Sequence, residues 1–429
     1  MSLLFGDDAV NNNSLSGKNY AFNELFSGCT TIILVSESFL PATTLANGCY
    51  YRMFKGCTSL TTAPELPATT LASSCYQYMF YGCSSLTTAP ELPATTLAGN
   101  CYDSMFYSCT SLTTAPELPA TTLASSCYYC MFYGCRRLTT APELPATTLE
   151  RNCYLYMFSN CTSLTVAPEL PATTLASSCY YYMFSGCSSL TAAPELPATT
   201  LDSSCYRSMF EGCSSLTAAP ELPAITLIGD CYYRMFKGCT SLTTAPELPA
   251  TTLASSCYYY MFSGCTSLTT ASSILPATTL ERNCYYGMFE GCRRLTTAPE
   301  LPATTLASSC YFRMFHSCTS LTTAPSILPA TTLADGCYYS MFSNCTSLTV
   351  APELPATTLA SGCYNGMFHS CHNLNYIKML ATDISASNCL SSWVYSVSST
   401  GTFVKNPAMT SLPTGSDGIP NDWTVVDDN

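Results

Sequence analysis

Apolar and polar positions recur along this chain with a period of 26 residues. The apolar pair Met-Phe begins at Met53 and returns after 26 or 27 residues each time, as far as Met367. Leu25 and Phe26 form a degenerate first copy, which brings the number of copies to 14. Periods of this length are typical of solenoids, in which stacked repeats bury one continuous core.

Each repeat is predicted to contain a short strand, a corner, an extended segment and a short helix. In the repeat 57–83, residues 59–63 are rich in β-compatible side chains and end at Pro64, which has no N–H for a strand ladder. Residues 68–71 form the second extended segment. Residues 72–83 place apolar side chains at i, i+1, i+4, i+5 and i+8, which is the spacing of a helix.

The ends of this helix and the core-facing side chains can also be predicted. Ser73 or Ser74 can cap its start and Gly82 suits its end, although packing must hold so short a helix. The side chains expected to face the core are Leu60, Ala63, Leu66, Leu71, Cys75, Tyr76, Met79, Phe80 and Cys83, with their equivalents in other repeats.

The predicted fold class is an α/β repeat solenoid. Residues 25–378 would form a right-handed stack of about 14 coils, with short parallel strands on one side and short helices on the other. The helix side should be the wider one, because packed helices lie about 8–10 Å apart and strands only about 4.8 Å apart. Residues 1–24 are predicted to be a lead-in or cap, and residues 379–429 a C-terminal cap.

Composition and charge exclude several classes of function. Only 10% of the residues are charged, against about 25% in ordinary soluble domains. A net charge of −12 disfavours nucleic acid as a partner, because proteins that bind it carry basic patches. No apolar run approaches the roughly 18 residues of a membrane span. Residues 1–8 lack the basic region and apolar core of a signal peptide.

The 29 cysteines form two columns, one from Cys49 to Cys389 and one from Cys29 to Cys371, with Cys130 outside both. Disulfides or metal sites are the functional alternatives. The predicted helices would separate the cysteines by about 8–12 Å, beyond the roughly 7 Å limit for the Cα atoms of a disulfide. No CxxC pair or histidine cluster suggests zinc. Free buried thiols, with no metal and no cofactor, are therefore expected.

Comparison of the repeats separates constant positions from variable ones. The two residues after the constant tyrosine vary, as in Asp103-Ser104, and so does the residue after the Met-Phe pair. We expect these positions to face solvent, and because Tyr and Arg are enriched in interfaces they form the candidate partner-binding face. Drift between duplicated repeats would produce the same variation. The candidate residues are Arg52, Lys55, Tyr78, Tyr81, Tyr107, Tyr133, Tyr182, Tyr260 and Arg313.

A second candidate is the constant glutamate of the Ala-Pro-Glu corner, together with the constant threonine pairs. Rows that repeat at the strand spacing would suit a periodic ligand such as a glycan or, more remotely, ice, although threonines also simply favour strands. A single line of carboxylates lacks the converging oxygens that calcium requires. The row, broken at Ser273 and Ser326, consists of Glu65, Glu91, Glu117, Glu143, Glu169, Glu195, Glu221 and Glu247.

Catalytic motifs do not appear, and we expect no enzyme activity. No HExxH, GxSxG, Walker or Rossmann pattern is present. His316 and His369 occupy one repeat position and His372 follows closely, which is typical of surface residues. A glycan hydrolase would need paired carboxylates in a pocket, and only the glutamate row offers carboxylates.

The run MFxGCxSLTxAPxLPxTTLxxxCY resembles the BspA-like leucine-rich repeats of bacterial surface proteins, whose pattern is roughly AFxxCxxLxxIxIPxxVxxI. The matching positions in one repeat are Phe80, Cys83, Leu86, Leu92, Pro93 and Leu97. The resemblance covers about residues 20–378, and departs in the longer repeat, the second cysteine, the Met before Phe and the proline at the Pro64 position. It implies surface display, binding of host or matrix components, and no catalysis.

The sequence thus predicts a non-catalytic extracellular or cell-surface protein that recognises a host or matrix protein, or a glycan. The alternative is a structural role, as a phage appendage in a virion or as a subunit of a self-assembling extracellular fibre. The lack of a signal peptide in residues 1–8 motivates this alternative. Head-to-tail self-association would fit it, because exposed end strands invite pairing.

Overall fold

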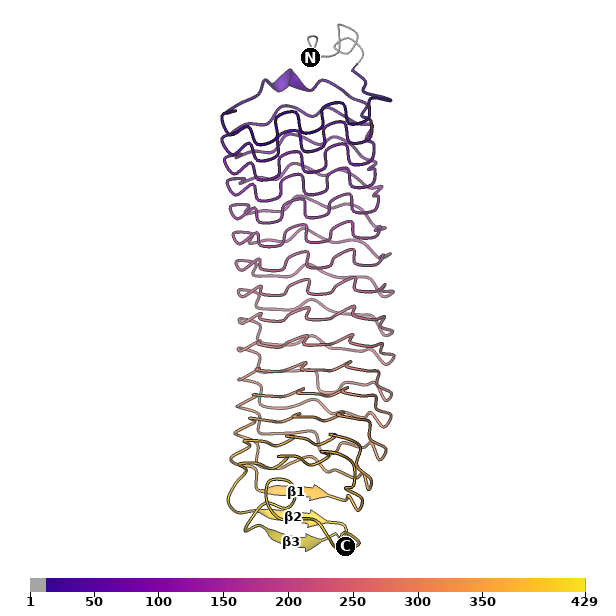
Figure 1. Cartoon of the computed structure of the whole chain (residues 1–429), viewed down its shortest axis with the longest axis vertical. Coiled ribbons are helices and arrows are strands. Elements are labelled where there is room, and N and C mark those ends of the chain that lie inside the picture. The colour runs from indigo at the N-terminus through magenta and orange to yellow at the C-terminus, as the bar shows by residue number, and fades with distance from the viewer. Residues whose placement is uncertain (1–12, 429) are drawn as a thin grey trace. The chain divides into compact units, whose positions relative to one another are not determined.

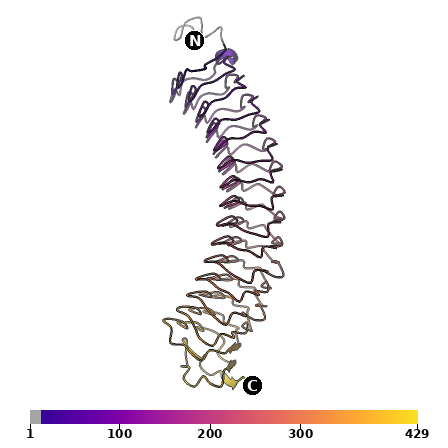
Figure 2. The same cartoon turned by 90° about the vertical axis from the view of Figure 1, so that its right-hand side faces the viewer.

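The computed structural model describes residues 13–428, so that the segment 1–8 and half of the expected lead-in lie outside the described residues. The chain divides into two compact units, Met1–Leu216 and Thr217–Asn429. Within each unit the repeats are coils stacked on one another (Figures 1 and 2). The boundaries at 24/25 and 378/379, and the number and handedness of the coils, stay predictions.

The prediction of a helix in each repeat is wrong for the described residues. Residues 72–83 form a run of tight turns in which φ is positive at every fourth residue: 56° at Ser74, 58° at Tyr78 and 72° at Gly82. An α-helix needs φ near −63° throughout, so none can pass through these residues. The one helix in residues 13–428 is the short 3-10 helix η1 (Glu37–Phe39). No helix among these residues is long and apolar enough to cross a membrane.

The peptide N–H groups of the turns alternate between two kinds of acceptor. The Met79 N–H donates to the carbonyl of Tyr76 in the same turn (3.1 Å), whereas the Phe80 N–H donates to the carbonyl of Met105 in the next coil (2.9 Å). A helix would use nearly all of these groups internally. Every second residue of the turns instead ties its coil to the next one.

This ladder brings neighbouring coils close together. The ring centroids of Tyr76 and Tyr102 lie 5.9 Å apart, and those of Phe80 and Phe106 lie 5.6 Å apart, with the rings stacked in both pairs. The prediction that this side of the stack is the wider one is therefore wrong, because the turn side is a hydrogen-bonded ladder like the strand side.

Regular strands are confined to one end of the described chain. The strands β1 (Tyr376–Met379), β2 (Thr402–Lys405) and β3 (Thr424–Asp427) form a parallel sheet in that order (Figure 1). In the repeats, both predicted extended segments are present only as single parallel bridges, such as Thr62 with Thr88. In most repeats a proline follows the first segment and ends its pairing.

The core is built as the apolar pattern predicts, with some differences. In the repeat 57–83 the predicted inward side chains are buried except Leu71, which is partly exposed, while Ala68 is buried although it was not predicted. Among their equivalents, Leu97 is buried, whereas Ala89 and Ala115 are partly exposed. All 29 cysteines are free, but not for the reason expected, since no helices hold them apart. The Cys83 thiol donates a hydrogen bond to the carbonyl of Phe54 in the preceding coil (3.1 Å), and the later cysteines of this column repeat the contact.

A loop covers the last turns of the unit Thr217–Asn429. The Ser392 N–H donates to Asp417 Oδ1 (2.7 Å), and the Val394 N–H donates to the carbonyl of Ser416 (3.2 Å). The indole of the fully buried Trp393 donates to the carbonyl of Gly418 (2.8 Å). Elsewhere in the stack, the N–H groups at the repeat positions of Ser392 and Val394 donate to the following coil.

The positive φ angles predict which glycines the ladder needs. Gly82→Ala should lower the free energy of unfolding by about 1 kcal/mol, since a Cβ disfavours φ near +72°. Gly99→Ala is the control, because Gly99 has no positive φ and its added Cβ would meet only Ser125 O at 3.7 Å. Chemical unfolding of both variants measures the difference, and equal effects would contradict the turn assignment.

The thiols should be present in full but hard to reach. Denatured, unreduced protein should release close to 29 titratable thiols per chain. Native protein should react far more slowly, because burial raises the pKa of the thiols, to about 11 at Cys57 and about 12 at Cys127, and removes the reactive thiolate. A low count after denaturation would show that disulfides have formed.

Candidate functional site

The turns present three columns of outward side chains, at the repeat positions of Tyr51, Arg52 and Lys55. We call these the first, second and third columns, and together the turn surface. The predicted partner-binding residues are all partly exposed and all lie in the second and third columns. Those of the second column are Arg52, Tyr78, Tyr182, Tyr260 and Arg313, and those of the third are Lys55, Tyr81, Tyr107 and Tyr133.

In the unit Met1–Leu216 these side chains stack on one another. Tyr81, Tyr107 and Tyr133 form a ladder with ring centroids 4.5 Å apart and ring planes within 6° of parallel. Lys55 Nζ lies 5.3 Å from the Tyr81 centroid and extends the column as a cation–π contact. Sequence comparison treated these residues as independent surface positions, whereas the structure joins them into one ordered surface.

Arg52 and Tyr78 form a second contact on the same unit. The Arg52 guanidinium lies 5.2 Å from the Tyr78 centroid and 4.7 Å from that of Tyr51. It also forms an ion pair with Glu24 at 3.0 Å, which raises the pKa of Arg52. This arginine already has an anionic partner within the chain.

The unit Thr217–Asn429 carries a longer ladder in the first column, which the sequence analysis missed. Successive centroids lie 4.4–4.6 Å apart along Tyr233, Tyr259, Tyr286, Phe312 and Tyr339. The sequence contains a signal for this ladder, because the repeat position of Tyr233 is aromatic in five consecutive repeats.

Two predicted residues lie beside this ladder. Tyr260 packs edge-on against Tyr259 (4.7 Å) and Tyr286 (5.2 Å). The Arg313 guanidinium lies 5.7 Å from the Phe312 centroid. The structure therefore distributes the nine predicted residues between the turn surfaces of two units and does not gather them into one pocket.

A carboxyl group is buried in the turn surface of the unit Met1–Leu216. The variable pair Asp103-Ser104 was expected to face solvent, but their exposed fractions are 6% and 3%. The Asp103 carboxylate accepts hydrogen bonds from Gln77 Nε2 and Ser104 Oγ, both at 2.7 Å. Burial dominates these contacts and raises the pKa of Asp103 to about 6.

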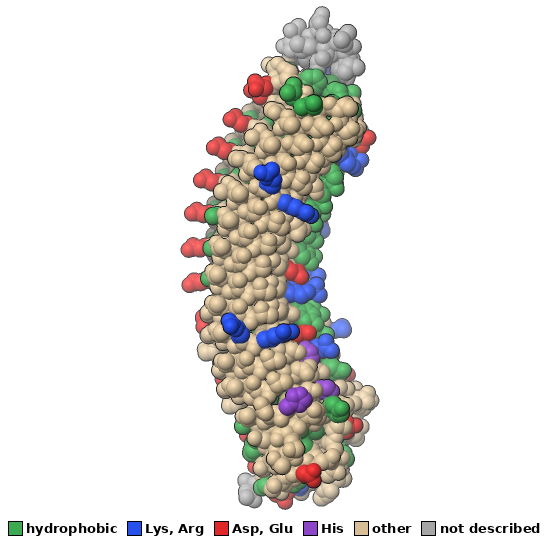
Figure 3. Space-filling model, turned by 90° about the vertical axis from the view of Figure 1, so that its left-hand side faces the viewer, with side chains coloured by type: hydrophobic (Ala, Val, Ile, Leu, Met, Phe, Trp, Pro, Cys, Tyr) green, Lys and Arg blue, Asp and Glu red, His purple; other side chains and the backbone are tan. Residues whose placement is uncertain are grey.

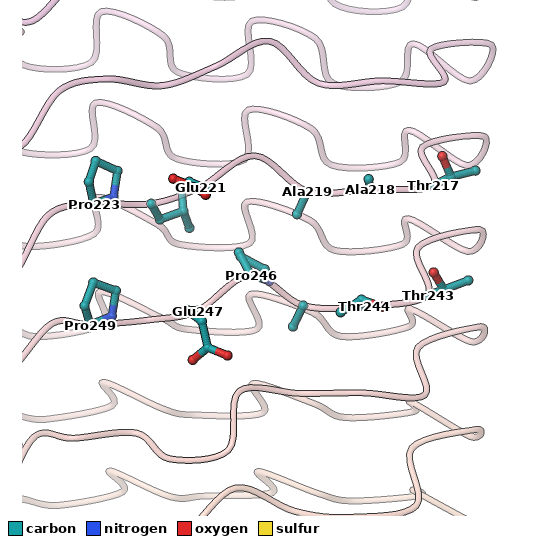
Figure 4. Close-up of a pocket in the computed structure, with 12 residues that line it drawn as sticks. Thr217, Ala218, Ala219, Glu221, Pro223, Thr243, Thr244, Pro246, Glu247 and Pro249 are labelled. Carbon is teal, nitrogen blue, oxygen red and sulfur yellow. The ribbon is translucent and has the colours of Figure 1, made fainter.

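The glutamates of the predicted row are all exposed at the Ala-Pro-Glu corner, on a different edge from the turn surface (Figure 3). Hollows lie between successive corners, and one of about 570 Å³ is lined by Glu221, Pro223, Glu247 and Pro249. Prolines contribute no N–H here, so the corners cannot form a continuous main-chain ladder. Figure 4 shows the Glu247 carboxylate pointing away from Glu221, so the row does not build a converging site.

The two 27-residue repeats show the main-chain pairing that the corner lacks in most other repeats. Their extra residue allows parallel bridges between Ile274 and Glu300 and between Ile327 and Glu353. The Leu275 N–H then donates to the Glu300 carbonyl (3.1 Å). The corner therefore pairs at the breaks in the glutamate row, and also at Glu65, whose N–H donates to the Glu37 carbonyl (3.0 Å).

The constant threonines have a structural role. The Thr113 hydroxyl donates to the carbonyl of Thr87 in the preceding coil (3.3 Å), and that of Thr269 donates to Thr243 (3.1 Å). Such contacts account for the constancy of the first threonine of the pair without a ligand. Within residues 13–428, no three of His, Cys, Asp and Glu gather as a metal site.

The buried carboxyl makes stability depend on pH. Because the pKa of Asp103 is raised above its usual 3.8, the folded protein holds this proton more tightly than the unfolded chain. The stabilisation is full below about pH 4 and is lost as the pH rises through about 6, by up to about 3 kcal/mol. Urea unfolding of wild type and Asp103→Asn at pH 4 and pH 7 measures this loss of stability. The variant should lack the part of the pH dependence that comes from the Asp103 carboxyl. Identical pH profiles would contradict the burial of a titrating Asp103.

Comparison with known proteins adds three findings. A family model described as "BspA type Leucine rich repeat region", in six copies, matches residues 23–165, 100–217, 131–246 and 203–349. A solved leucine-rich repeat protein from Bacteroides ovatus is similar at 16% identity and a TM-score of 0.45, over 89% of this chain and 87% of that one. No curated protein matches the chain.

Proposed function

The chain belongs to the BspA-type leucine-rich repeat family, and from that membership we propose that it is a non-catalytic binding protein that recognises its partner through the turn surface. The observation that carries the proposal is the stack of Tyr81, Tyr107 and Tyr133 beside Lys55, ordered but only half-buried. Aromatic and cationic side chains supply much of the energy of protein interfaces. Rings already held in a stack lose little freedom on binding.

The turn surface is better suited to recognition than the threonine and glutamate rows. Its side chains differ from coil to coil on a backbone of constant geometry, so that each stretch presents a distinct pattern. The threonine hydroxyls are used between coils, as at Thr113, and the glutamates project singly from the corner. The partner that fits the proposal is a host or matrix protein, or a glycan.

Surface display is part of the proposal and rests on the family, whose members are typically associated with the cell surface. A fibre or virion subunit that grows by end-to-end stacking has less support. The cap already occupies two of the N–H groups that a further coil would need, through Asp417 at Ser392 and through Ser416 at Val394. A capped stack favours a discrete binding protein over a filament.

Two matched triple variants test which surface binds. Replacement of Tyr81, Tyr107 and Tyr133 by serine should weaken binding to a partner found on an array of matrix proteins and glycans by at least about tenfold, the effect of losing one interface hot spot. Replacement of Glu91, Glu117 and Glu143 by glutamine should leave binding within about twofold, and thermal unfolding checks that both variants fold. Loss of binding only in the glutamine variant, or silence of wild type on every target, would overturn the proposal.

A further inference from the structure

Charge is distributed unevenly in the unit Thr217–Asn429. Glu221 and Glu247 lie at the corner edge, whereas Arg234 and Arg313 lie in the second column of the turn surface. Figure 3 shows the same tendency, with a row of acidic side chains along one edge and no such row elsewhere on that face. The turn surface of this unit therefore carries both signs of charge, with these two arginines in the second column and Glu290 in the third.

The two arginines are held against aromatic rings. The guanidinium carbon of Arg234 lies 5.0 Å from the Tyr233 centroid and 5.7 Å from that of Tyr260, and that of Arg313 lies 5.7 Å from the centroid of Phe312. A stacked guanidinium keeps the donors at its edge in a fixed plane, which suits two-point contact with a carboxylate or sulfate.

Neither arginine forms an ion pair within the described residues, although the Glu290 carboxylate lies close enough to Arg313 to interact with it electrostatically. Arg52 pairs with Glu24, but no ion pair forms at Arg234 or Arg313. Both side chains are partly exposed, so an anion in solvent can reach their guanidinium groups.

We propose that this patch, made of the ladder from Tyr233 to Tyr339 with Arg234 and Arg313, binds a linear anionic polysaccharide. The inference rests on the proposed function and names the chemistry of its partner. The arginines take the carboxylates or sulfates, and the phenol hydroxyls along the ladder exchange hydrogen bonds with the sugar hydroxyls.

One feature favours a polysaccharide over an acidic peptide. An extended peptide would need main-chain partners, but the N–H of Tyr260 is bonded to Tyr286 (2.7 Å) and that of Arg313 to Tyr339 (2.8 Å).

The test measures binding of the full chain to heparin, polygalacturonate and neutral dextran by biolayer interferometry at low and high salt. Wild type should bind at least one of the two polyanions and not dextran. Arg234→Ala with Arg313→Ala should weaken that binding by roughly tenfold or more, as the loss of charge-assisted hydrogen bonds implies. The control is Arg293→Ala with Arg294→Ala, which removes the same charge from exposed positions outside the patch and should change binding less than about twofold.

A second variant separates specific contact from charge. Arg234→Lys with Arg313→Lys keeps the charge but loses the planar stacked donors, and should recover only part of the binding. Equal weakening in the patch and control variants, or full recovery with lysine, would show general charge attraction and overturn the inference. Binding of a protein target through the turn surface, with no polyanion bound, would overturn it while the proposed function stands.

Discussion

The main-chain hydrogen bond from every second turn residue to the next coil is the constraint on which the rest of this structure depends. The bond from the Phe80 N–H to the Met105 carbonyl is one example among many. To aim alternate N–H groups out of the coil, the backbone must turn sharply, and it does so through positive φ angles at Ser74, Tyr78 and Gly82. Glycine and small polar residues at two of these positions follow from that geometry.

The same bond sets what lies inside and outside the turns. It holds successive coils at a separation at which aromatic rings of equivalent residues stack, both in the core at Tyr76 and on the surface at Tyr107. Side chains at one repeat position therefore become a column. A substitution in one repeat acts on its neighbours in the column, so the surface is determined by runs of repeats and not by single residues.

The corner is the counterpart of the turns. There the prolines withhold the N–H groups that a ladder needs, and hollows lined by proline and glutamate remain between coils. The extra residue of the longer repeats restores pairing at Ile274 and Ile327. The turn side thus has constant geometry and variable side chains, while the corner has constant side chains and interrupted pairing. This contrast is why recognition is assigned to the turns.

The sequence by itself determined the repeat, its apolar core and the columns in which the cysteines lie, because burial of the same apolar positions in every copy leaves a periodic record. It also located the variable positions that the turn surface displays. It could not distinguish a helix from a run of turns over residues 72–83, since both place the same side chains inward and differ in where the peptide N–H groups go. Only the tertiary structure decided that, because the acceptors belong to the next coil. For the same reason only the structure joined Tyr233 to Tyr339 as a ladder and buried Asp103, since both depend on the spacing between coils.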